Sequence, residues 1–196
     1  MKEIISDIRA AVMATIALAV VCCGLYPLFV YGIGSALFHD KAEGSLLYDS
    51  KGNVVGSRLI GQNFAADKYF HSRPSAAGNG YDATSSGGSN LGPTSKKLAD
   101  SIAQNVADYR TQNGLATNAP VPADAVTASA SGLDPHISVA NAEIQAARVA
   151  KVRHIQVDDV LTLVREHTDQ PTLGLLGEPG VNVLELNLAL NNLGVH

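Results

Sequence analysis

A glycine-rich stretch in the middle of the chain has the spacing closest to a nucleotide-binding motif. A phosphate-binding loop follows the pattern G-x-x-x-x-G-K-[ST], in which backbone amides surround the phosphates and the lysine neutralises them. Gly87 and Gly92 have this glycine spacing, but Pro93 follows them where the lysine should stand. Proline has neither an ammonium group nor an amide hydrogen. The stretch is therefore not expected to act as a self-sufficient nucleotide hydrolase.

The same stretch contains a second, shorter signature. Ser86-Gly87-Gly88-Ser89 resembles the SGG-type signature of ABC ATPases, and with Asn90 it forms a candidate loop for ATP binding. Four small residues are also what a tight turn requires. A turn-forming role is the favoured interpretation, and direct ATP binding by this loop is the alternative.

The other residue types that carry chemistry do not form a recognisable catalytic pattern. The hydroxyl residues of 127–131 lack a G-x-S-x-G elbow. The adjacent carboxylates Asp158 and Asp159 stand at a predicted helix start, where they complement the helix dipole. No histidine has a metal-binding spacing such as H-E-x-x-H. The histidines are His39, His71, His136, His154, His167 and His196. We predict no catalytic residue, no metal site and no cofactor of the chain's own.

The elements that position these residues begin with an apolar N-terminal segment. No charged residue lies between Ala10 and Phe38, and this run exceeds the ~20 residues that cross a bilayer. We predict a membrane anchor over residues 1–39, with the span at about 12–34. A cleaved signal peptide is one alternative, but its apolar region is usually only about 7–15 residues long. A lipoprotein site at Cys22 is another, for which the bulky Val21 is unfavourable.

Part of the anchor is predicted to pack against other membrane helices. Gly32 and Ala36 form a small-xxx-small pair, which lets two helices approach closely, although such a pair also arises by chance in a Gly/Ala-rich segment. Pro27 removes one backbone hydrogen bond, so a kink there or an early end of the regular helix is expected. The predicted packing residues are Gly24, Pro27, Gly32 and Ala36.

Charge limits the functions of the remaining chain. There are 14 Lys and Arg against 18 Asp and Glu, and both cysteines lie in the anchor. Nucleic acid is not expected as a partner because its binding needs a basic surface. A disulfide or a cysteine metal site is not expected in the soluble part. Lys2 and Arg9 precede the span, and this slight basic excess predicts a cytoplasmic N-terminus with the soluble domain on the other side.

Residues 40–196 are predicted to form one soluble α+β domain with a short sheet and about four helices. Two strands, 45–49 and 54–60, should be joined by a turn that contains Gly and Asn. A third short strand is predicted at 125–130, and residues 71–95 read as a long loop. Four helices are predicted. The first covers 96–113, the second is capped by Ser138 and runs through 152, and the third covers 158–167. The fourth runs from Asn182 to about Gly194 and begins with an Asn182-x-x-Glu185 capping box.

Several blocks of residues, in order along nearly the whole chain, resemble the C subunit of the bacterial Kdp potassium-transporting P-type ATPase. The blocks are GLYP at 24–27, VGSRLIGQNF at 55–64, YFHSRPSA at 69–76, SGGSNLGP at 86–93, VTASASGLD at 126–134 and NVLELNLAL at 182–190. Departures from the family pattern at 95–97, Val139 and Gly180 affect local helix caps and one charge contact.

The resemblance implies a noncatalytic accessory subunit of a high-affinity, ATP-driven potassium uptake complex in the bacterial inner membrane. Its implied partners are a P-type ATPase subunit, a channel-like potassium-binding subunit, a small single-span subunit and the lipid bilayer, with ATP entering at the level of the complex. Such a subunit stabilises the assembly and acts as a catalytic chaperone that raises the ATPase subunit's ATP affinity. If the domain lies outside, that effect must be allosteric. A membrane-tethered periplasmic enzyme or ligand-binding protein remains the alternative.

Overall fold

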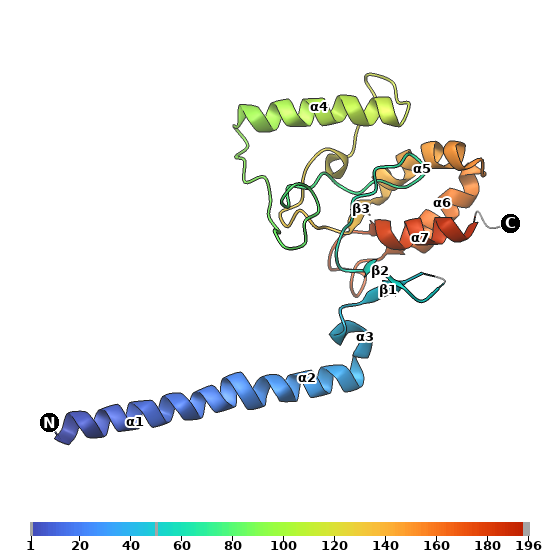
Figure 1. The fold of residues 1–196 in the computed structure, drawn as a ribbon. Coiled ribbons are helices and arrows are strands. Elements are labelled where there is room, and N and C mark those ends of the chain that lie inside the picture. Colours follow the sequence, from blue (N-terminus) through green and yellow to red (C-terminus); the bar gives the residue numbers. More distant parts are fainter. Residues whose placement is uncertain (1, 50, 194–196) are drawn as a thin grey trace. The chain divides into compact units, whose positions relative to one another are not determined.

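The computed structural model describes residues 2–49 and 51–193, which belong to two compact units (Figure 1). The first unit is Met1–Leu46 and the second is Leu47–His196. The predicted division into an anchor, residues 1–39, and a soluble domain, residues 40–196, stays a prediction.

The first unit is a long helical stretch followed by a short helix. It consists of α1 (Lys2–Ala19), a π-helical segment η1 (Val20–Leu25), α2 (Tyr26–Leu37) and α3 (His39–Ala42). Glu3–Leu37 is the one helical stretch among the described residues that is long and apolar enough to cross a membrane. None of its described side chains is buried by the rest of the chain.

Pro27 lies next to a change in helical hydrogen bonding, whereas the sequence predicts a kink there or an early end of the regular helix. It lies in the first turn of α2, directly after the π-helical segment Val20–Leu25. A proline ring clashes with the carbonyl four residues earlier and leaves that carbonyl without its usual donor. The wider π-helical turn accommodates both effects. The helix does not end soon after the proline, because α2 continues to Leu37.

A two-stranded sheet follows α3 and consists of β1 (Leu46–Tyr48), whose first residue is the last of the first unit, and β2 (Val54–Ser57). Both predicted strands are confirmed, although β2 is shorter than the predicted 54–60. The Asp49 carboxylate accepts hydrogen bonds from the amides of Lys51 and Asn53, both at 2.8 Å. The Asn53 side chain also donates to Asp49 Oδ2, at 3.0 Å. This side-chain bond, and then the bond from the Asn53 amide, lower the pKa of Asp49. The same bonds stabilise the turn between the strands.

A second sheet is antiparallel and has the order β3-β5-β4. Its strands are β3 (His136–Ser138), β4 (Thr168–Asp169) and β5 (Gly180–Asn182). The predicted strand at 125–130 is wrong. A 3₁₀ turn, η2 (Ala123–Ala125), precedes that segment, and both the amide and the hydroxyl of Thr127 donate back to the carbonyl of Ala123. These local bonds curl the backbone away from an extended conformation.

Four helices complete the second unit, as predicted. They are α4 (Lys96–Gln112), α5 (Val139–Arg153), α6 (Val157–Glu166) and α7 (Val183–Leu193). Ser138 caps α5 by accepting from the amide of Asn141 at 3.1 Å, and Asn182 caps α7 by accepting from Glu185 at 3.2 Å. Both predicted N-cap residues are confirmed. The reciprocal half of the predicted capping box is not formed among the described residues, because the Asn182 amide donates to the His167 carbonyl and the Glu185 carboxylate lies 3.3 Å from Arg58 Nε. The predicted end of the last helix at Gly194 lies outside the described residues.

The core lies where α5, α6 and α7 pack on the three-stranded sheet. Its fully buried members include Phe70, Ile137, Val149, Val160, Val181, Leu186 and Leu190. Helix α4 lies apart from these three helices (Figure 1) and buries only Tyr109. Residues 71–95 contain no helix or strand, as the sequence predicts, and this long loop leads from the core to α4 (Figure 1).

Candidate functional site

The candidate ATP loop, Ser86–Asn90, packs against residues 129–132. The amide of Gly87 donates to the carbonyl of Ser131 at 2.9 Å, and the Ser86 hydroxyl donates to the same oxygen at 3.0 Å. A Cβ atom on Gly88 would lie 3.0 Å from the carbonyl oxygen of Ala130. The amide of Gly87 thus already has an acceptor within the chain, and the missing side chain at position 88 allows the two segments to approach closely.

Gly132 is the point at which three loop segments meet. It has a φ of +67°, and a Cβ atom there would lie 2.7 Å from both the amide nitrogen of Ala77 and the carbonyl oxygen of Gly87. The Ser75 hydroxyl donates to the carbonyl of Gly132 at 2.6 Å. The glycines at 87, 88 and 132 therefore hold loops together, while binding of ATP at Ser86–Asn90 stays a prediction.

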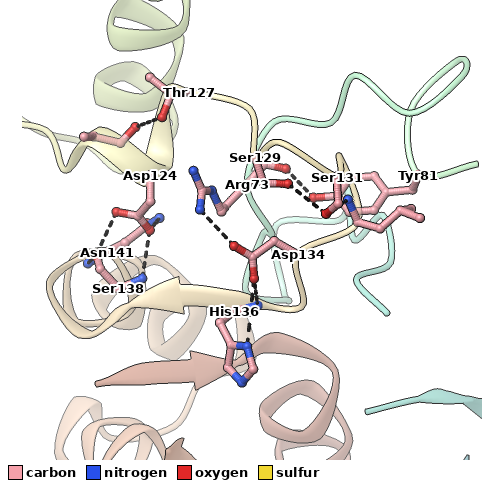
Figure 2. A network of polar contacts seen from close by, with 12 residues as sticks. Arg73, Tyr81, Asp124, Thr127, Ser129, Ser131, Asp134, His136, Ser138 and Asn141 are labelled. Atoms are coloured by element: carbon pink, nitrogen blue, oxygen red, sulfur yellow. Dashed lines mark hydrogen bonds and ion pairs between the residues drawn. The ribbon is translucent and has the colours of Figure 1, made fainter. Parts of the chain in front are cut away.

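A line of charged side chains runs from this contact to the sheet (Figure 2). Arg73 Nη1 lies 2.8 Å from Asp134 Oδ2. The other oxygen of Asp134 accepts from the amide of His136 at 3.0 Å, and His136 Nε2 lies 2.9 Å from Asp169 Oδ2. The long loop and two edge strands are thereby connected through polar contacts.

The line continues to α7 through Arg58. Its Nη2 lies 2.6 Å from Asp169 Oδ1, and its Nε lies 3.3 Å from Glu185 Oε1. Arg58 and Asp169 are each 45 % exposed in their side chains, so solvent screens this pair and its contribution to stability is small. The arrangement orients β4, α7 and the chain after β2 and offers no reacting group.

A second polar cluster fixes the start of α5 (Figure 2). Asp124 Oδ2 accepts from the amide of Ser138 at 2.8 Å and from Asn141 Nδ2 at 2.9 Å, and Asp124 Oδ1 accepts from the Ser138 hydroxyl at 2.7 Å. The Tyr109 hydroxyl donates to Asn141 Oδ1 at 2.8 Å. Burial raises the pKa of Tyr109, which keeps its hydroxyl a donor. This cluster joins η2, α4 and α5.

Arg148 on α5 anchors the chain that leads into the long loop. Its guanidinium donates to Asn113 Oδ1 at 3.0 Å, to Gln145 Oε1 at 2.9 Å and to the carbonyls of Asp67 and Tyr69. Burial lowers its pKa, but the acceptors around it satisfy the charge. The sequence analysis missed this network. The signal it left is the spacing of Asn141, Gln145 and Arg148, which places three polar side chains on one buried face of α5.

A cavity of about 460 Å³ lies between α4, the start of α5 and residues 63–81. Arg73 lines it, and its buried Nε has no acceptor among the described residues. Burial, and then the charge of Arg148, lower the pKa of His71, which also lines the cavity. The other polar lining residues include Asn63, Asn105, Asp108, Gln112, Asn141 and Gln145. None of the residues Ser86–Asn90 borders this cavity.

The polar side chains that line the cavity suit it to recognition of a polar ligand. Within residues 2–49 and 51–193, no three His, Cys, Asp or Glu side chains are grouped so that they would hold a metal ion. Of the predicted histidines, only His71 lies at the cavity, His136 belongs to the line of charges, and His196 is outside the described residues.

The predicted packing residues of the anchor lie on an open surface. A Cβ atom on Gly24 or Gly32 would meet no atom within 4 Å, and Ala36 is exposed. Contact of this surface with another helix stays a prediction.

Comparisons with known proteins all point to one family. A sequence model of the KdpC family, described as K⁺-transporting ATPase, c chain, matches residues 8–192. The chain is 56 % identical over 169 residues to a potassium-transporting ATPase KdpC subunit of Mycobacterium bovis, covering 86 % of this chain and 89 % of that protein. A protein of the same name from Koribacter versatilis is 48 % identical over 190 residues, covering 97 % of this chain and 94 % of that protein.

Proposed function

The chain belongs to the KdpC family, the c chains of K⁺-transporting ATPases, and from this premise we propose that it stabilises the assembled complex and raises the ATP affinity of its P-type ATPase subunit. The observation that carries the proposal is the extent of the family match. Residues 8–192 include the apolar helix as well as the domain that follows it. Similarity confined to the domain would have fitted a soluble binding module equally well.

The proposed partners are the P-type ATPase subunit, a channel-like potassium-binding subunit and a small single-span subunit in the bacterial inner membrane. The N-terminus is cytoplasmic and the domain lies outside, which the basic residues Lys2 and Arg9 ahead of the span support. In this orientation the chain raises the ATP affinity of the ATPase subunit allosterically, because the domain and the ATP lie on opposite sides of the membrane. The open surface around Gly32 and Ala36 supports a route through the anchor, because it allows another helix to pack closely.

This role needs no active site in the chain itself, and turnover belongs to the ATPase subunit. The polar clusters around Asp124 and Arg148 support that assignment, because their side chains hold secondary-structure elements together. ATP is then a ligand of the complex. Contact of ATP with Ser86–Asn90 is a separate possibility that requires its own measurement.

The test compares complexes prepared with and without this chain, purified through a tag on the ATPase subunit. We expect the complex without the chain to be recovered in lower yield and to show a higher KM for ATP in potassium-stimulated hydrolysis. Equal yields and equal KM values would refute both parts of the proposal. A pull-down in mild detergent that recovers no multispan protein would instead favour the membrane-tethered enzyme or ligand-binding protein.

Two further measurements separate the remaining possibilities. The full-length chain in detergent is titrated with labelled ATP up to millimolar concentration, and the absence of saturable binding would end the idea of a nucleotide loop. Reporter fusions at the C-terminus, active on one side of the membrane only, establish the orientation.

A further inference from the structure

The loop between β4 and β5 exposes three leucines close together. Leu173, Leu175 and Leu176 are 88 %, 86 % and 64 % exposed, so the rest of the described chain covers little of them. Single exposed apolar residues are common on protein surfaces, but a group of leucines on one short loop is a typical feature of a contact surface.

The backbone of this loop is preformed. The amide of Thr172 donates to the carbonyl of Leu176 at 2.9 Å, and the amide of Leu176 donates back to Thr172 at 3.0 Å. Leu173 and Gly174 have φ values of +57° and +73°. A leucine in this left-handed region is unusual. A turn that is already ordered loses little conformational freedom on binding, which favours recognition by a partner of matching shape.

One acidic side chain, Glu178, lies next to the leucines in the loop. Glu178 is exposed and forms no ion pair within the part of the chain that the structure describes. A cavity of about 260 Å³ at the base of the loop is bordered by Leu176, Glu178, His136 and Asp169. Residues 170–179 contain no basic and no aromatic side chain.

We propose that residues 172–176, here named the leucine turn, insert into an apolar pocket of a neighbouring membrane subunit whose edge carries a basic side chain facing Glu178. This inference rests on the proposed function, which supplies such subunits. A polar rim around an apolar centre is the usual composition of a specific protein interface.

Charge and sequence favour a protein over the lipid surface as the partner. Anionic lipid surfaces attract basic segments, whereas this loop has only Glu178 as a charged residue. The loop also lacks the Trp and Tyr side chains that favour the bilayer interface.

The test measures how fast maleimide labels Leu175→Cys in the full-length chain, with Cys22→Ser and Cys23→Ser removing the native thiols. The labelling rates of the chain alone and of the complete complex are compared in nanodiscs of the same lipid. In the chain alone, Ser101→Cys on the exposed side of α4 gives the labelling rate of an exposed thiol as the control. We expect labelling of Leu175→Cys to be at least about tenfold slower in the complex, because the core of an interface excludes water.

Each other outcome counts against the leucine turn. Equal labelling in the complex and in the chain alone would overturn it. Protection already present in the chain alone would assign the leucines to lipid or to a second copy of the chain. If the chain without the Leu175→Cys change recovers no other subunit in a pull-down, the proposed function fails, and this inference fails with it. Recovery of the complex with free labelling refutes the leucine turn alone.

A second pair of variants measures the contribution to association. Leu175→Ser should weaken retention of the chain in the complex at least about tenfold, as expected for a central apolar anchor. Leu59→Ser, which changes another exposed leucine outside this loop, should leave retention unchanged. Equal retention of the Leu175→Ser and Leu59→Ser variants in the complex would contradict the inference.

Discussion

His136 on β3 contacts Asp169 on β4 across the central strand β5, with 2.9 Å between Nε2 and Oδ2. The contact is possible because Gly180 of β5 lies between the two residues and has no side chain. A Cβ atom on Gly180 would approach the Cβ of His136 to 3.3 Å. This side-chain contact between the two edge strands therefore depends on a glycine in the strand that separates them.

We predict that Gly180→Val displaces the His136 ring and destabilises the domain by roughly 1–3 kcal/mol, because the added atoms overpack this site. Thermal unfolding of the full-length chain in detergent measures the effect. Gly92→Val is the control, since a Cβ there would meet nothing within 4 Å. Equal unfolding temperatures for the two variants would show that the stability of the domain does not require a residue without a side chain at position 180.

At Gly132, an added methyl group has both a conformational and a steric cost. Gly114 has a similar φ of +64° but open space around its Cβ position. We expect Gly114→Ala to cost about 1 kcal/mol for the left-handed backbone, and Gly132→Ala roughly 2–4 kcal/mol because it also clashes with Ala77 and Gly87. Denaturant unfolding of both variants measures the difference. If the two variants lose the same stability, the close contact of the three loop segments is not rigid.

Asp124 is predicted to be the main support for the start of α5. Asp124→Ala removes the acceptor for three donors, those of Ser138 and Asn141. The loss should be roughly 3 kcal/mol, because hydrogen bonds to a charged group are strong and buried donors would remain unpaired. Asp100→Ala, which breaks only an exposed ion pair with Lys96, should change stability by about 0.5 kcal/mol or less. Hydrogen exchange of the first turn of α5 would locate the effect.

His71 should make the fold sensitive to mild acid. Its pKa in the folded chain is below the ordinary value of 6.5, chiefly because of burial and then because of Arg148. The folded state therefore takes up a proton less readily than the unfolded chain. The group does not affect stability above about pH 6.5, and stability falls as the pH drops below this value.

The variant His71→Gln should reduce that loss of stability between pH 7.5 and pH 5, measured by thermal unfolding. His154→Asn is a matched control because His154 is exposed at the end of α5 and has a left-handed backbone that Asn tolerates. An identical pH dependence in parent and His71→Gln would exclude His71 as a source of acid sensitivity.

The anchor surface offers a prediction about assembly. Gly32→Leu should lower recovery of the complex through a tag on this chain at least about tenfold, because a large side chain prevents close helix packing. Val30→Leu changes the opposite side of α2 and should leave recovery unchanged. Similar recovery of the two variants would remove Gly32 from the packing surface.

Local sequence patterns were sufficient for elements whose stabilising contacts are local. The apolar run alone specifies a helix that can span a membrane, because length and the absence of charge are the physical requirements. The caps at Ser138 and Asn182 followed from side chains that bond amides three residues later. Periodic apolar positions likewise predicted α4 to α7 and hence the α+β class.

Long-range contacts explain where the sequence misled. Residues 125–130 have strand-like composition, yet Thr127 bonds back to Ala123 while Asp124 is held by Ser138 and Asn141. The strand that joins the sheet is His136–Ser138, whose partner Gly180–Asn182 lies far along the chain. Pairing over such a distance is selected by packing and not by local propensity.

The sequence by itself thus determined the apolar helix, the order of the helices and, through its blocks of residues, the family. Only the tertiary structure decided which polar residues meet: His136 with Asp169 over Gly180, and Arg148 with Asn113 below α4. The physical reason is that a buried polar group requires a partner, but its own sequence neighbourhood does not specify which one. The same holds for the leucine turn, because only the folded structure shows that Leu173 and Leu175, at 88 % and 86 % exposed, are more exposed than the other large apolar side chains described.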